Sequence, residues 1–170
     1  MNFWKLIDAF DLVTYGETMG LSEEEIENTT EYQQFYAAAF QKGNGEIVIA
    51  YRGTDGENGG YDTNFDILKT ITTFDTDFAK EHLLTNGKIA AGIPGKQFEM
   101  AEWYYKKIKK IDETKSVSFT GHSLGGGLSQ YAKVMSGEES ALKTWNGIGV
   151  AGLGKINGYE FLGYNSSGLS

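Results

Sequence analysis

Thr120-Gly121-His122-Ser123-Leu124-Gly125-Gly126-Gly127 is the stretch of sequence that decides the fold. A short apolar run, residues 116–120, precedes it, and residues 124–136 follow with apolar side chains at helical spacing. The stretch therefore predicts a β-strand, a sharp turn at Ser123 and an α-helix. Gly121 and Gly125 flank Ser123 at minus two and plus two, where such a turn leaves no room for side chains. This is the G-x-S-x-G pattern of a nucleophile elbow, and it makes Ser123 a candidate catalytic residue.

A second chemically marked strand end lies upstream of this turn. Residues 46–51 are almost wholly apolar, as expected of a strand buried on both faces, and they lead directly into Arg52-Gly53-Thr54. Strands and helices alternate from residue 47 onward, which predicts an α/β fold whose mostly parallel central sheet is flanked by helices. In such sheets the active groups gather at the carboxyl ends of the strands. We therefore expect Thr54 to lie near Ser123, with Arg52 holding the loop in place through its guanidinium group.

A nucleophilic serine needs hydrogen-bond donors for the negative charge that develops on the attacked carbonyl oxygen. The backbone N–H of Leu124, one residue after Ser123, is placed to be one donor. Thr54 is the candidate for the second donor, through its backbone N–H and with a further bond from its hydroxyl. Ser123, Leu124 and Thr54 are therefore the candidate site residues.

Together the two motifs resemble those of the class 3, or fungal-type, lipase family. They are Tyr51-Arg52-Gly53-Thr54 after an apolar strand and Gly121-His122-Ser123-Leu124-Gly125-Gly126 downstream. The resemblance covers roughly residues 33–150 and implies an α/β-hydrolase-like fold, with Ser123 as nucleophile and Thr54 and Leu124 as the oxyanion hole. It implies that His122 is not the catalytic base. It also implies hydrolysis of carboxylic esters, such as acylglycerols or phospholipids, with no metal or organic cofactor. The resemblance also implies a mobile lid between residues 56 and 91. The alternative for this segment is an ordinary insertion that packs on the rest of the domain.

The acid and base of the triad are missing from the sequence. The family orders its triad as Ser, Asp and His, yet no Asp and no His follows Ser123. The acids that do follow are Glu138, Glu139 and Glu160, and the first two are expected in a solvated turn after the helix. The only histidine besides His122 is His82, for which a surface or packing role is expected.

Two explanations of the missing groups remain open at this point. The sequence favours the amino-terminal part of a longer hydrolase, incomplete at its C-terminus, whose acid and base lie beyond Ser170; these residues alone would then have little esterase activity. The other explanation is a natural chain without ordinary triad chemistry, acting as a catalytically inactive module that binds a lipid or protein partner. An acyltransferase or thioesterase that uses the same serine is a further alternative.

Periodicity and capping residues predict the remaining elements. Helices are expected over residues 3–13, 22–28, 98–110 and 124–136, and strands over residues 33–41, 46–51, 117–120, 141–146 and 159–164. Ser22 and Glu25 fit a capping box, Lys42-Gly43-Asn44-Gly45 fits a hairpin turn, and Gly137 fits a helix C-cap. The lysines near the end of the helix over residues 98–110 are expected to be solvated.

Length and composition limit the class of protein. The 170 residues fit a single α/β-hydrolase-like domain, residues 1–170, and 40% hydrophobic residues are enough for a sizeable core. A net charge of −8 argues against nucleic-acid binding and against steady adsorption to an anionic bilayer, but leaves transient contact with a lipid interface open. No signal peptide and no spanning segment is visible, so we expect a soluble protein. The sequence does not indicate the compartment or the oligomeric state.

Overall fold

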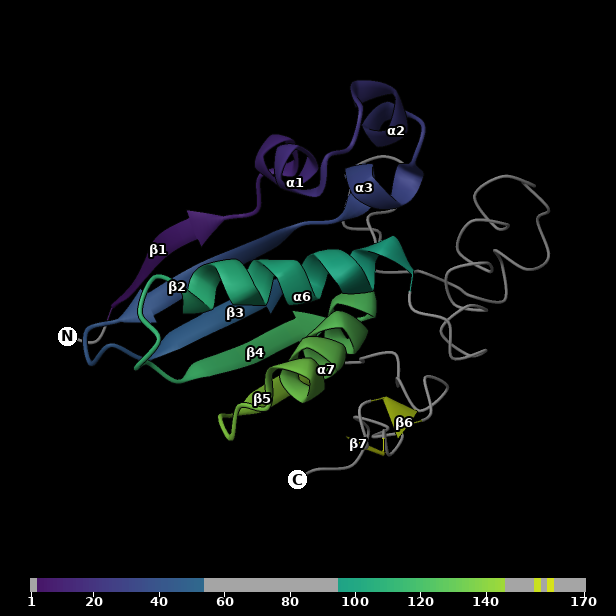
Figure 1. Cartoon of the computed structure of the whole chain (residues 1–170). Helices are drawn as coiled ribbons and strands as arrows, with labels where there is room; N and C mark the ends of the chain where they lie inside the picture. The colour runs from purple at the N-terminus through teal and green to yellow at the C-terminus, as the bar shows by residue number, and fades with distance from the viewer. Residues whose placement is uncertain (1–2, 54–94, 146–154, 157–158, 161–170) are drawn as a thin grey trace, which may run out of the picture.

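A mixed five-stranded β-sheet forms the centre of the molecule (Figure 1). The computed structural model describes residues 3–53, 95–145, 155–156 and 159–160. In chain order its elements are β1 (Trp4–Ala9), α1 (Leu12–Met19), α2 (Glu23–Glu27), α3 (Thr30–Gln34), β2 (Ala37–Lys42), β3 (Ile47–Tyr51), α6 (Lys96–Lys109), β4 (Val117–His122), α7 (Leu124–Ser136), β5 (Leu142–Trp145), β6 (Lys155–Ile156) and β7 (Tyr159–Glu160). The sheet order is β1-β2-β3-β4-β5, and β6 pairs with β7.

Of the four strand pairs in this sheet, two are antiparallel and two are parallel. The prediction of a mostly parallel sheet is therefore corrected to a mixed sheet. β1 pairs antiparallel with β2, and β2 pairs antiparallel with β3 through the predicted hairpin. β3, β4 and β5 are parallel to one another. The α/β character is confirmed. β2 and β3 are antiparallel because their short hairpin turn reverses the chain, whereas a parallel connection needs a crossover segment.

Both long helices lie on one face of the sheet (Figure 1). α6 connects β3 to β4 and α7 connects β4 to β5, and both pack through apolar stripes onto buried residues of these strands. Ile47, Ile49, Val117 and Phe119 are all at most 1% exposed on this face. The Tyr51 hydroxyl donates a 2.9 Å hydrogen bond to the Ala101 carbonyl and so fixes α6 over the end of β3.

The amino-terminal helix expected over residues 3–13 is wrong. The structure has β1 there, followed by α1, which begins where the Asp11 side chain accepts a hydrogen bond from the Val13 N–H. Residues Phe3 and Leu6, which belonged to the supposed helical stripe, are more than half exposed. A β-bulge between Leu6 and Asp8 shifts the alternation of the strand by one residue. The supposed helical stripe also combined residues of β1 with Phe10 and Val13, which lie beyond the strand.

Most of the other predicted elements are confirmed with small changes at their ends. α2 has the full capping box between Ser22 and Glu25, and α7 ends at Gly137 with a left-handed φ of 66°. The strand expected from residue 33 starts only at Ala37, because α3 continues to Gln34. β7 covers the start of the strand expected over residues 159–164, whose remaining residues lie outside the described part of the chain. The lid expected between residues 56 and 91 lies outside it as well.

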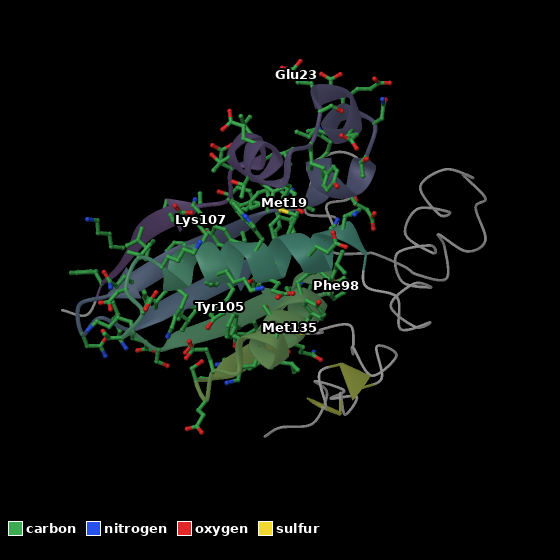
Figure 2. The ribbon with its side chains drawn as sticks, in the orientation of Figure 1. Met19, Glu23, Phe98, Tyr105, Lys107 and Met135 are labelled. Carbon is green, nitrogen blue, oxygen red and sulfur yellow. The ribbon has the colours of Figure 1, made fainter. Side chains whose placement is uncertain are left out.

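Ion pairs join α6 to its neighbours on two sides. They correct the expectation of solvation for Lys107, Lys109 and Glu138, whereas Lys106, Lys110 and Glu139 are exposed as expected. Lys107 pairs with both carboxylate oxygens of Asp8 in β1 at 2.8 Å, and Figure 2 shows Lys107 on the β1 side of α6. Lys109 pairs with Glu138 at 2.7 Å, and the Tyr105 hydroxyl donates to the same carboxylate at 3.0 Å. The Glu138 side chain is only 12% exposed. These partners come from distant parts of the sequence, so no local pattern reports them.

Glu138 gives a first test of this packing. Burial by itself raises the pKa of its carboxyl group, but the hydrogen bonds from Lys109 and Tyr105 outweigh burial and hold that pKa below its ordinary value. A depressed pKa in the folded state stabilises the protein above the pKa of the unfolded chain, and this stabilisation is lost as pH falls through the folded pKa. Glu138→Gln should therefore lower the free energy of unfolding by about 2 kcal/mol at pH 7 and by much less near pH 3.5.

Urea unfolding at the two pH values measures this difference. The control is Glu139→Gln at the exposed neighbouring position, which should cost no more than about 0.5 kcal/mol at either pH. The buried ion pair would be contradicted if the two variants lost the same free energy of unfolding, or if the loss from Glu138→Gln did not change with pH.

Candidate active site

Ser123 lies at the junction of β4 and α7, as the G-x-S-x-G pattern predicts. It is the N-cap of α7, with φ 53° and ψ −124°, and its side chain does not cap the helix. Among the described residues it is the only one other than glycine with a positive φ. Such a conformation costs a side-chain-bearing residue about 1–3 kcal/mol and persists only where the surroundings impose it. The Ser123 hydroxyl is thus not used to cap α7.

Three glycines let the elements at this turn approach one another more closely than any side chain would allow. A Cβ built on Gly121 would lie 2.2 Å from the Gly125 carbonyl oxygen, and one on Gly125 would lie 2.2 Å from the Tyr51 carbonyl oxygen. A Cβ on Gly53 would lie 2.6 Å from the His122 carbonyl oxygen and 3.4 Å from the Ser123 Cβ. The end of β3 is therefore in contact with the turn at Ser123. The contact made by Gly53 is a site feature that the sequence motifs did not reveal.

Most backbone N–H groups around Ser123 have partners, but among the described residues the N–H of Leu124 has none. The Ser123 N–H donates to the Trp145 carbonyl at 3.1 Å, and the Ser123 carbonyl accepts from the Gly126 and Gly127 N–H groups at 2.9 and 3.4 Å. Within the described residues no acceptor bonds the N–H of Leu124, the first residue of α7. A helix N-terminus also carries a partial positive charge. A serine hydroxyl beside such a donor is the combination that acyl transfer requires.

Arg52 has the structural role that its guanidinium group suggested. Its backbone N–H donates to the Tyr36 carbonyl at 3.0 Å, and its guanidinium donates to the Gln34 carbonyl at 3.3 Å. The guanidinium carbon also lies 5.4 Å from the centre of the Tyr36 ring. Arg52 thus ties the chain that leaves β3 to the segment between α3 and β2, immediately before Gly53.

The remaining candidates are placed as follows. Leu124 is 5% exposed and packs into the core, so its backbone faces the turn while its side chain holds α7 in place. Thr54 and His82 lie outside the described residues. His122 is exposed at the end of β4. Glu138 is at the far end of α7, about 20 Å from Ser123 along the helix axis, and is therefore not its partner.

Trp145 is a further neighbour of the turn that the sequence alone did not single out. It is the last residue of β5 and stands opposite His122 in the parallel register. The only feature of the sequence that could have indicated Trp145 was its position at the end of a predicted strand. That signal becomes informative only when β5 is known to lie beside β4.

The described residues offer neither a metal-binding cluster nor a membrane-spanning helix. They contain no group of three or more His, Cys, Asp or Glu side chains arranged to hold a metal ion. None of their helices has both the length and the apolar character needed to cross a membrane.

The sequence from residue 4 to residue 155 matches the model of a phospholipase-like family, described as a Tle-like phospholipase domain. No curated protein and no solved structure is significantly similar to the chain. The family match confirms a lipase or phospholipase type of domain. It does not extend to the class 3 lipase family in particular.

Proposed function

The chain belongs to the Tle-like phospholipase domain family, and from this premise we propose that it is a serine hydrolase of lipid esters. Its substrate class is the carboxylic ester bond of phospholipids or acylglycerols, as in the class 3 lipases that its motifs resemble. The observation that carries the proposal is the strained Ser123 at the start of α7, beside the N–H of Leu124, for which no described residue supplies an acceptor.

The first half of the reaction follows from this geometry. The Ser123 Oγ attacks the acyl carbonyl carbon, its proton passes to a general base, and the carbonyl oxygen becomes an oxyanion. The Leu124 N–H donates to that oxyanion, and the helix N-terminus adds favourable electrostatics. Thr54 is the proposed second donor, since the preceding residue, Gly53, is in van der Waals contact with the turn.

The second half of the reaction restores the enzyme. The tetrahedral species collapses, the alcohol takes a proton and leaves, and an acyl-Ser123 ester remains. Water then attacks this ester and releases the fatty acid. We assign the base and its acid partner to residues outside the described part of the chain, because Glu138 is bound to Lys109 at the wrong end of α7.

Product analysis tests which bond is cleaved. The natural protein, incubated with a phosphatidylcholine of defined acyl chains, should release free fatty acid and lysophosphatidylcholine, identified by mass spectrometry. Ser123→Ala should lower the rate by three or more orders of magnitude. Diacylglycerol or phosphatidic acid as the main product would contradict the proposal, because these arise from cleavage of a phosphate ester.

The same assay separates hydrolysis from acyl transfer. With a primary alcohol added as acceptor, a hydrolase should still release mainly free fatty acid. Formation of mainly the new ester would instead assign the chain to the acyltransferases.

A further inference from the structure

An exposed aromatic side chain lies directly beside the proposed nucleophile. Trp145, at the carboxyl end of β5, is 52% exposed, although its backbone carbonyl accepts the N–H of Ser123 at 3.1 Å. Exposed apolar surface beside a site can mark a place where a partner binds. Its position beside Ser123 makes Trp145 the exposed aromatic residue to consider for contact with a partner.

A cation accompanies this ring. The Lys143 ammonium lies 5.3 Å from the centre of the Trp145 ring, and both residues belong to β5 two positions apart. Side chains two apart on a strand point to the same side of the sheet. Among the described residues no carboxylate lies within 4 Å of the Lys143 ammonium, so its charge has no ion-pair partner there. The pair thus presents an indole ring and a positive charge on one side of β5.

The order of the two residues along the strand matches the layers of a phospholipid surface. Trp145 is at the tip of β5, and Lys143 is set back by about 7 Å, the length of two residues in a strand. Tryptophan prefers the boundary between headgroups and acyl chains, and lysine reaches the phosphates that lie closer to water. A strand approaching a bilayer end-on would therefore place Trp145 at the boundary and Lys143 at the phosphate level.

We propose that Trp145 and Lys143 form a phospholipid-surface contact that holds the carboxyl edge of the sheet, and with it Ser123, against the bilayer. The proposal rests on the proposed function for the nature of the substrate. Its other support is independent of the reaction: the exposed ring, the paired cation and their order along β5. The Lys143 ammonium complements the phosphate of the headgroup.

The chain contains a matched control for this contact. Trp4 in β1 is 44% exposed, and the Lys42 ammonium lies 5.3 Å from the centre of its ring, the same distance as in the first pair. Trp4 is the first residue of β1, which runs in the same direction as β3. It therefore lies at the amino edge of the sheet, opposite the edge that carries Ser123. If any exposed Trp–Lys pair were sufficient for binding to a phospholipid surface, the Trp4–Lys42 and Trp145–Lys143 pairs would contribute equally to it.

Vesicle binding measures the contact directly. The natural protein carrying Ser123→Ala, which prevents turnover, is mixed with phosphatidylcholine vesicles that contain brominated phosphatidylcholine as a quencher of tryptophan fluorescence. Quenching should persist in Trp4→Phe and disappear in Trp145→Phe. Trp145→Ala should lower the partition coefficient about tenfold, which corresponds to about 1.4 kcal/mol, and Lys143→Gln should lower it several-fold. Trp4→Ala and Lys42→Gln should change it less than twofold.

Three results would overturn the contact: no binding by the parent protein, unchanged binding by Trp145→Ala, or equal losses from Trp4→Ala. Hydrolysis of a short-chain ester dissolved as monomers separates this proposal from the previous one. Lys143→Gln, in a chain that retains Ser123, should hydrolyse the soluble ester within twofold of the wild type, and a large loss would make Lys143 part of the site structure instead. Vesicle binding that depends on Trp145, in a protein with no ester hydrolysis at all, would leave the contact standing while the proposed function fails.

Discussion

Replacing Ser123 with glycine is expected to abolish lipid-ester hydrolysis and at the same time to raise the melting temperature of the natural protein. Ser123 has φ 53° and ψ −124°, a conformation that glycine adopts without the penalty that a Cβ incurs. Relief of about 1 kcal/mol of backbone strain should raise Tm by about 2–4 °C for a chain of this size. The loss of the nucleophile should reduce turnover by three or more orders of magnitude.

Ser123→Ala is the matched variant for this experiment, because it removes the hydroxyl and keeps the Cβ. Its turnover should fall as far as that of Ser123→Gly, while its Tm should stay within about 1 °C of the wild type, since the backbone strain remains. Calorimetry or a thermal shift assay, run beside the ester assay, gives both quantities. If glycine and alanine had the same Tm, the turn at Ser123 would not store strain, and the nucleophile-elbow geometry would be wrong.

Gly125→Ala should be, with Gly121→Ala, among the most destabilising additions of a single methyl group at the described positions. Its Cβ would lie 2.2 Å from the Tyr51 carbonyl oxygen and 2.8 Å from the Arg52 carbonyl carbon. Both neighbours are backbone atoms of β3 and its exit, so no side chain can rotate away. We expect a loss of about 3 kcal/mol or more, even though alanine has the higher helix propensity, and a fall in Tm of about 6–12 °C.

Gly43→Ala is the control for this loss, since nothing lies within 4 Å of the added Cβ and the position has no positive φ. It should change the unfolding free energy by no more than about 0.5 kcal/mol. Gly125→Ala should also reduce ester turnover in the fraction that remains folded, because displacement of α7 moves the Leu124 N–H. An unchanged Tm in Gly125→Ala would mean that α7 does not begin against the end of β3.

The parts of the fold that the sequence predicted are those encoded by neighbouring residues. The turn at Ser123 was predictable because glycine spacing, an apolar strand and a helical stripe occur within a few positions of one another. The capping box at Ser22 and the C-cap at Gly137 were predictable for the same reason. β1 was not, because a bulge between Leu6 and Asp8 changes the periodicity on which the prediction depended.

The parts that were missed depend on contacts between distant segments. Gly53 and Trp145 acquire their positions from the order of β3, β4 and β5 in the sheet, which no local pattern specifies. Glu138 looked like a residue of a solvated turn because its partners, Lys109 and Tyr105, are about 30 positions away. The antiparallel pairing of β1 with β2 was missed together with β1 itself.

The central claim, that Ser123 is the nucleophile of a lipid-ester hydrolase, is tested most directly by fluorophosphonate labelling of the natural protein. Such probes form a stable adduct with an activated serine and leave other serines unmodified. We predict a single adduct, mapped by peptide mass spectrometry to Ser123 and absent from Ser123→Gly. Ester turnover by a protein in which Ser123 stays unlabelled, or an adduct on another serine, would contradict the claim.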